Sequence, residues 1–323
     1  MPAPSDRGPD GPVAFVLGGG GVHGAAEVGM LAALADRGIV PDLVLGTSVG
    51  ALNGALLAAD PDTAVARLAH LWTTIDEYSP FDASLIERAS TFARTRTHLH
   101  GNHRLRRMLL SHLDVRRFEQ LSLPFQCVAA SIERASARWF AEGELIPALL
   151  ATTAVPGLLP PVEIDGEHYL DGGLVDSIPV GRAIELGAKC VYVLQVGRIE
   201  QPLVAPTRPW EVGLVAFEIA RRHRFVEAME RVPDDVDVHV LPSGADLEPT
   251  DTAQFRYRDT SNVAARIEGA EVTAGEYLDG LVTGGGQGRA DERDGVGRRE
   301  GVAVARSNGR DAESGDVADG QER

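Results

Sequence analysis

The chain has 323 residues, of which 44% are hydrophobic, enough to bury a sizeable core in one large α/β domain or two small ones. Its formal net charge of −16 argues against general nucleic-acid binding, which requires a basic face. We therefore expect no nucleic-acid partner.

Strands and helices are predicted to alternate from the N-terminal end. Apolar patterning predicts a strand over residues 13–17, a helix over 25–36, a strand over 42–45 and a helix over 49–59. This order favours a parallel sheet with right-handed crossovers. The further elements that we expect are a mainly helical region over 62–120, strands over 125–131, 190–196 and 236–241, a hairpin over 162–170, and helices over 144–153, 179–186 and 221–231.

Composition changes near both ends of the chain. Residues 1–11 are polar and rich in Pro and Gly, which predicts a disordered lead. From residue 284 to residue 323, Gly, Arg, Asp, Glu and Ser dominate and aromatic residues vanish, which predicts a disordered tail. Residues 12–283, between the lead and the tail, are predicted to form one domain.

The cysteines and the apolar runs bear on the compartment. Cys127 and Cys190 lie in apolar, strand-like runs without metal-binding spacing, as is typical of reduced core cysteines in a cytosolic protein. The first residues lack the apolar segment of a secretory signal, and no apolar run reaches the ~18 residues of a membrane span. We therefore expect a cytoplasmic protein whose contact with membranes is at most peripheral.

Two glycine-containing motifs follow one another within one βαβ length. The sequence GTSVG at residues 46–50 has the form G-x-S-x-G, which places Ser48 on a sharp turn between a strand and a helix. The sequence GGGGVHG at residues 18–24 has the form of a backbone anion cradle at a helix N-terminus. Together they provide what acyl transfer needs, a serine nucleophile beside N–H groups that hold an oxyanion.

Each motif also has a simpler interpretation. The serine motif alone is compatible with an ordinary junction in which Ser48 caps a helix. The glycine motif also fits a dinucleotide fingerprint, which needs an acidic residue at the end of the second strand. Asp42 begins that strand rather than ending it, so the dinucleotide interpretation fails.

The residues alone leave the general base open. His168, His223 and His239 come late enough in the chain for a Ser-His-Asp triad, but none lies in an evident loop at a strand end. Asp171 follows a strand end and could act directly on the serine, although Asp-Gly is also a common turn.

Four motifs in order resemble those of the patatin-like phospholipase family. They are LGGGGVHG at residues 17–24, GTSVGALNG at 46–54, AVPGLLPP at 154–161 and DGGLVDSIPV at 171–180. The resemblance covers about residues 13–241. It implies an α/β fold of three layers, in which helices flank a central, mostly parallel sheet, and it makes residues 12–283 an acyl hydrolase domain.

The resemblance also implies a mechanism without histidine, metal or organic cofactor. Ser48 would be the nucleophile and Asp171 the base of a Ser-Asp dyad that cleaves lipid esters through an acyl-enzyme. Apart from the resemblance, Asp176 is a second candidate base, although its place in the segment that leads into Pro179 favours a structural role. The N–H groups around Gly19, Gly20 and Gly21 would form the oxyanion hole. The supporting motif residues are His23, Gly24, Gly46, Gly50, Gly172 and Gly173. His23 departs from the family, which usually carries Arg or Lys there. The alternatives are a short-chain esterase or thioesterase with the same dyad, and a non-catalytic lipid-binding module.

Residues 94–117 form a stretch rich in Arg and His within an acidic chain. The simplest interpretation is a solvated helical face. A metal site from His98, His100 and His103 lacks acidic partners, so we expect no metal. The functional interpretation is a patch for anionic lipid headgroups. Its expected apolar side consists of Leu105, Leu109, Leu110 and Leu113.

Overall fold

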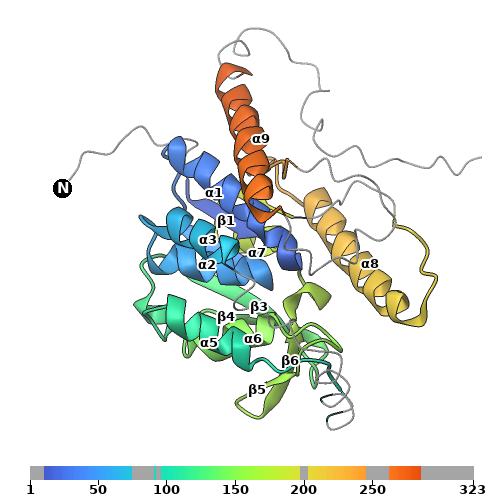
Figure 1. The fold of residues 1–323 in the computed structure, drawn as a ribbon. Helices are drawn as coiled ribbons and strands as arrows, with labels where there is room; N and C mark the ends of the chain where they lie inside the picture. Colours follow the sequence, from blue (N-terminus) through green and yellow to red (C-terminus); the bar gives the residue numbers. More distant parts are fainter. Residues whose placement is uncertain are drawn as a thin grey trace, which may run out of the picture.

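The computed structural model describes residues 11–74, 91, 95, 97–196, 203–244 and 262–284. Within these residues, helices cover both faces of an eight-stranded sheet, so the predicted α/β fold is confirmed (Figure 1). The expected tail, apart from its first residue, lies outside the described residues, and so does the expected lead up to residue 10.

Five strands form the parallel part of the sheet. They are β1 (Val13–Leu17), β2 (Leu43–Thr47), β3 (Phe125–Ser131), β7 (Cys190–Leu194) and β8 (Asp237–Val240). Their spatial order is β3-β2-β1-β7-β8, with every neighbouring pair parallel. All five had been predicted, with ends within two residues of those observed.

Three antiparallel strands extend this sheet beyond β3. They are β4 (Ser136–Phe140), which was not predicted, and β5 (Val162–Ile164) and β6 (Glu167–Asp171), which form the expected hairpin. β4 pairs with β3 along one edge, whereas β2 and β6 share the other edge. On that shared edge Thr47 pairs with Val128 and Asp171 pairs with the next residue, so the C-terminal ends of β2 and β6 meet head to head.

Alternation along the strands separates two hydrophobic cores. On β1, Phe15 and Leu17 belong to one core, and Ala14 and Val16 belong to the other. The first core is covered by α1 (Ala25–Asp36), α2 (Val49–Ala59), α3 (Ala64–Thr73), α5 (His103–His112), α6 (Leu145–Thr152) and α9 (Val263–Gly284). The second core is covered by α7 (Val180–Glu185) and α8 (Pro209–Glu230). This arrangement is the expected three-layer architecture.

The two long helices differ from the sequence-based expectation. α8 begins at Pro209 rather than near residue 221, and α9 was not predicted. α9 packs along α1, as Figure 1 shows at the top of the molecule. The contact is close because Gly29 of α1 has no side chain. A Cβ atom at Gly29 would lie 2.0 Å from the carbonyl oxygen of Ile267 in α9. None of the described helices is both long and apolar enough to cross a membrane.

We predict that Gly29→Ala lowers the free energy of unfolding by about 1–3 kcal/mol, because the added methyl group pushes α9 away from α1. Urea unfolding followed by circular dichroism measures this loss. The matched control is Gly280→Ala, which adds the same group on α9 where a Cβ atom meets open space. The control should be neutral or stabilising by up to about 1 kcal/mol, since alanine favours the helix. Equal effects of the two substitutions would contradict the close packing at Gly29.

Candidate active site

Ser48 lies on the sharp turn that the sequence predicts between β2 and α2. Its backbone has φ 53° and ψ −122°, in the left-handed half of conformational space that residues with a side chain rarely adopt. The flanking glycines allow the turn to close. A Cβ atom at Gly46 would lie 2.5 Å from the Cα of Ala51, and one at Gly50 would lie 2.3 Å from the carbonyl oxygen of Leu17.

The Ser48 hydroxyl donates a hydrogen bond to Asp171 Oδ2 at 2.7 Å. The second carboxylate oxygen, Oδ1, accepts the backbone N–H of Gly173 at 2.8 Å. Both side chains are shielded from water, with Ser48 9% exposed and Asp171 1% exposed. The structure therefore brings together the two residues that the family resemblance singles out.

Backbone contacts hold both members of this pair. The N–H of Ser48 donates to Thr152 Oγ1 at 3.0 Å, and the N–H of Asp171 donates to the carbonyl of Ala154 at 3.0 Å. Thr152 and Ala154 lie at the end of α6 and just beyond it, so one short segment positions both residues. Sequence reasoning missed Thr152, since nothing in the local pattern distinguishes it from an ordinary helix terminus.

Burial sets the protonation of Asp171. Loss of water raises the pKa of Asp171 to about 7, although the hydrogen bonds from Ser48 and Gly173 act in the opposite direction. Asp176, the alternative base, also has its pKa raised by burial, to about 6. Its backbone carbonyl accepts the Thr47 hydroxyl at 2.9 Å, but it is the carboxylate of Asp171 that accepts the Ser48 hydroxyl.

The glycine turn, which consists of residues 18–21, passes beside Ser48. The N–H of Gly19 donates to the carbonyl of Ser177 at 3.0 Å, so it is already occupied. The expectation that Gly19 supplies an oxyanion donor therefore stays a prediction, and it would require this hydrogen bond to be exchanged. A Cβ atom at Gly19 would lie 3.1 Å from Ser177 Oγ, so the missing side chain leaves room for that hydroxyl. Within the described part of the chain, the N–H groups of Gly20 and Gly21 donate to no backbone carbonyl.

The other supporting glycines lie where neighbouring atoms leave no room. A Cβ atom at Gly24 would lie 2.6 Å from Val49 Cγ2, and one at Gly172 would lie 2.1 Å from the carbonyl oxygen of Val128. His23 lies between the turn and α1, in the 3₁₀ helix Gly21–Gly24, and is partly buried.

A buried polar network beneath the glycine turn was not expected from the sequence. The amide of Asn53 donates to the carbonyl of Gly24 at 3.0 Å and to Glu27 Oε2 at 2.7 Å, and its oxygen accepts the Trp72 indole N–H at 3.0 Å. Burial raises the pKa of Glu27 well above its usual range. The network joins α1, α2 and α3 directly behind the turn.

The three histidines considered as bases have other neighbours. His168 is half exposed and contacts Glu133 at 2.8 Å. His239 stacks on Tyr192, with the ring centroids 5.1 Å apart, and burial lowers its pKa. His223 is largely exposed on α8. The hydroxyl of Ser48 is paired with Asp171 rather than with any of these rings.

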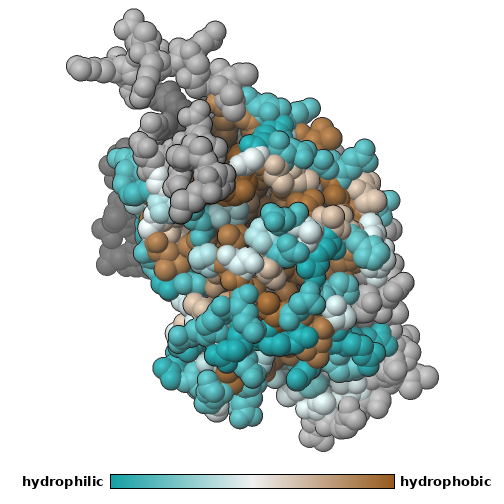
Figure 2. All heavy atoms as spheres, turned by 90° about the vertical axis from the view of Figure 1, so that its left-hand side faces the viewer, coloured by the Kyte–Doolittle hydropathy of each residue, from teal (hydrophilic) through white to brown (hydrophobic). Residues whose placement is uncertain are grey.

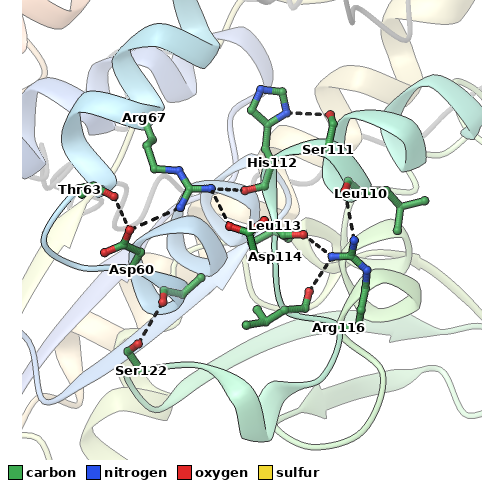
Figure 3. Close-up of polar contacts among 12 residues, drawn as sticks. Asp60, Thr63, Arg67, Leu110, Ser111, His112, Leu113, Asp114, Arg116 and Ser122 are labelled. Carbon is green, nitrogen blue, oxygen red and sulfur yellow. Dashed lines mark hydrogen bonds and ion pairs between the residues drawn. The ribbon is translucent and has the colours of Figure 1, made fainter.

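The basic stretch is partly used for structure. Figure 3 shows the Arg116 guanidinium turned toward the C-terminal end of α5, where it donates to the carbonyl of Leu110 in the helix and to those of Leu113 and Val115 beyond it. Arg67 of α3 reaches the same end of α5, donating to the carbonyl of His112 at 2.5 Å.

The expected apolar side of a lipid-binding patch does not face the solvent. Leu105, Leu109 and Leu113 are 5% exposed or less and belong to the first core, whereas Leu110 is 39% exposed. That part of the expectation is wrong, because α5 uses these leucines to pack against the domain. Within the described residues, no group of three or more His, Cys, Asp or Glu side chains could hold a metal ion.

Comparison with known proteins identifies the family of the chain. The model of the family described as Patatin-like phospholipase matches residues 15–184, more than half of the chain. The chain belongs to the patatin-like phospholipase family. It is 34% identical over 192 residues to a patatin-like phospholipase domain-containing protein of Caenorhabditis elegans, covering 58% of this chain and 14% of that protein. It is 31% identical over 188 residues to the lysophospholipase nte1 of Emericella nidulans, covering 58% of this chain and 12% of that protein.

This patatin-like chain therefore corresponds to a small part of these relatives. A solved structure, VipD from Legionella pneumophila, aligns with 84% of this chain and 67% of its own at 15% identity and a TM-score of 0.41.

We predict that Asp171→Asn changes how stability depends on pH. Asp171 has a raised pKa only when folded, so the unfolded chain loses this proton first and wild-type stability falls as the pH rises from about 4 to 7. Asparagine carries no proton to lose. The free energy of unfolding of the variant relative to wild type should rise by about 4 kcal/mol across this range and level off above it. Urea unfolding between pH 4 and 9 measures the difference, and a constant value would contradict the buried carboxylate.

Proposed function

We propose that this protein is a serine acyl hydrolase that cleaves carboxylic ester bonds of lipids, with Ser48 as nucleophile and Asp171 as general base. The observation that carries the proposal is the 2.7 Å hydrogen bond between the Ser48 hydroxyl and a carboxylate shielded from water. Family membership and relatives named lysophospholipase support a lipid ester as substrate.

The proposed reaction has two halves. In the first, Asp171 takes the Ser48 proton while Oγ attacks the ester carbonyl carbon, and the resulting tetrahedral intermediate expels the alcohol, which receives that proton. This leaves an acyl group on Ser48. In the second half Asp171 takes a proton from water, the hydroxide attacks the acyl carbon, and the fatty acid leaves as Ser48 regains its proton.

Electrostatics support both halves. A carboxylate with a pKa of about 7 is a much better base near neutral pH than an ordinary aspartate with a pKa of ~4. For the negative charge on the former carbonyl oxygen, we propose the N–H groups of Gly20 and Gly21 as donors, because the N–H of Gly19 is bonded to Ser177.

We predict that Ser48→Ala and Asp171→Asn each lower kcat by about 10³-fold or more, because nucleophile and base act as one unit. Hydrolysis of p-nitrophenyl esters from acetyl to palmitoyl measures the loss. Wild-type kcat/KM should rise about tenfold per pH unit up to about pH 7 and then level off, since Asp171 must be ionised. His168→Gln is the matched control and should retain wild-type activity.

The outcomes separate the alternatives. Activity that survives Asp171→Asn but not Asp176→Asn would make Asp176 the base. A preference for acetyl or butyryl esters would indicate a short-chain esterase or thioesterase. A folded wild-type protein that hydrolyses no ester and does not react with a fluorophosphonate probe would be a non-catalytic binding module.

We also propose that the exposed face of α5 contacts anionic lipid headgroups. Arg106 and Arg107 are exposed on this helix, and no hydrogen bond to a backbone carbonyl holds them as such bonds hold Arg116 among the described residues. Figure 2 shows hydrophilic side chains gathered over the lower part of the molecule, at the height of α5 in Figure 1. Since Leu105 and Leu109 are buried, the contact is electrostatic rather than by insertion.

We predict that the double variant Arg106→Glu/Arg107→Glu loses most of its binding to vesicles containing phosphatidylglycerol, and that wild-type binding weakens with salt. Co-sedimentation with vesicles at low and physiological ionic strength measures this. The matched control, Arg138→Glu/Arg231→Glu, changes the net charge equally at exposed sites on β4 and after α8. Equal losses in both variants would reduce the effect to net charge, and unchanged binding would exclude α5 as the contact.

A further inference from the structure

Arg221 is a buried cation that reaches the glycine turn from outside the region that the family model matches. It lies on α8, it is only 4% exposed, and its Nη1 donates to the carbonyl oxygen of Gly19 at 3.3 Å. Its other nitrogens are held by Glu218, with Nε at 3.2 Å from both carboxylate oxygens and Nη2 at 3.1 Å from Oε2. Glu218 therefore fixes the orientation of the guanidinium that contacts the turn.

The Gly19 carbonyl and the Gly20 N–H belong to one peptide unit. The described chain has no cis peptide bonds, and in a planar trans peptide the C=O and the N–H point in opposite directions. A guanidinium that holds the Gly19 carbonyl therefore fixes the Gly20 N–H on the side away from α8. A cation at the carbonyl also polarises the peptide and strengthens its N–H as a donor.

From this geometry we infer that Arg221 is a positioning residue for the oxyanion hole, which orients and polarises the Gly20 N–H through the carbonyl of Gly19. The inference rests on the proposed acyl hydrolase function. Glu218 is the residue that aims Arg221. Since glycine has no side chain to restrict its backbone, the hydrogen bond from Arg221 to the Gly19 carbonyl adds to the backbone hydrogen bonds that hold the turn in one orientation.

A second contact of α8, through Phe217, also holds the site in place. Phe217, one residue before Glu218, packs against the turn after Asp171: a Cβ atom at Gly173 would lie 2.5 Å from Phe217 Cζ. The N–H of Gly173 donates to the Asp171 carboxylate. Two residues one helical turn apart on α8 thus contact both halves of the site: Arg221 contacts the glycine turn, and Phe217 contacts the turn after Asp171.

The test compares Arg221→Met with Arg222→Met. Arg222 is the adjacent residue, and its Nε also lies 3.5 Å from Glu218 Oε2, so both substitutions remove a cation from the same carboxylate. Among the side-chain hydrogen bonds of the described residues, only the one from Arg221 reaches the Gly19 carbonyl. The assays are hydrolysis of p-nitrophenyl butyrate and inhibition by a 1,1,1-trifluoroalkan-2-one, whose carbonyl becomes a charged hemiketal oxygen when a serine attacks it.

We expect Arg221→Met to lower kcat about 10- to 100-fold with KM within about threefold, less than the ~10²- to 10³-fold loss when an oxyanion donor itself is removed. The inhibition constant of the ketone should rise by the same factor as kcat/KM falls. Binding of the matching 1,1,1-trifluoroalkan-2-ol, which cannot form an oxyanion, should not change. Arg222→Met should behave like wild type, and Arg221→Lys should recover part of the loss because its ammonium can still donate one hydrogen bond.

Wild-type affinity for the ketone in Arg221→Met would overturn the inference, as would equal losses in Arg222→Met, which would indicate general loosening of α8. If Arg221→Met does not fold, as judged by circular dichroism and gel filtration, Arg221→Lys and Glu218→Gln are compared in the same way. Unchanged ketone affinity in both would then overturn it. A wild-type protein that neither hydrolyses the ester nor binds the ketone would overturn the proposed function itself, and the inference with it.

Discussion

The arrangement of the site depends on two strands that meet head to head along one edge of β3. Thr47, the last residue of β2, pairs with Val128, and Asp171, the last residue of β6, pairs with the residue after it. Backbone register therefore brings Ser48 and Asp171 together, although 123 positions separate them in the chain. At this junction the backbone of β3 lies so close to residue 172 that only glycine fits there. A Cβ atom at Gly172 would collide with the carbonyl oxygen of Val128.

This junction holds two features that oppose folding. Ser48 occupies a backbone conformation that is unfavourable for any residue with a side chain, and Asp171 is a carboxyl group withdrawn from water. Such features persist only where the surrounding structure leaves no alternative. Here that structure consists of two hydrophobic cores, one on each face of the sheet, and of backbone hydrogen bonds from Ser48 to Thr152 and from Asp171 to Ala154. A change in the Ser48 backbone or in the burial of Asp171 would therefore require a hydrophobic core to repack or one of these hydrogen bonds to break.

The sequence was most informative where a feature is local. The strand, the turn and the helix around Ser48 could be predicted because glycine spacing and apolar periodicity act over a few residues. The choice of Asp171 over a histidine could not be made from local pattern and came from the family resemblance, since it depends on which strand ends meet. The bond between Gly19 and Ser177 escaped prediction for the same reason. α9 was missed because it contains Gly269, Gly275 and Gly280, and glycine is unfavourable in the interior of a helix.

The peptide unit between Gly19 and Gly20 has two sides with different physical demands. Its N–H side is the one proposed to meet the reacting oxygen, and the chemistry there requires a donor in a fixed position. Its carbonyl side meets Arg221, on a helix that follows the region matched by the family model. A change in α8 can therefore alter the strength of the donor without altering the nucleophile, the base or the glycines. Because planarity of the peptide transmits the effect, no movement of the turn is needed for α8 to influence the reaction.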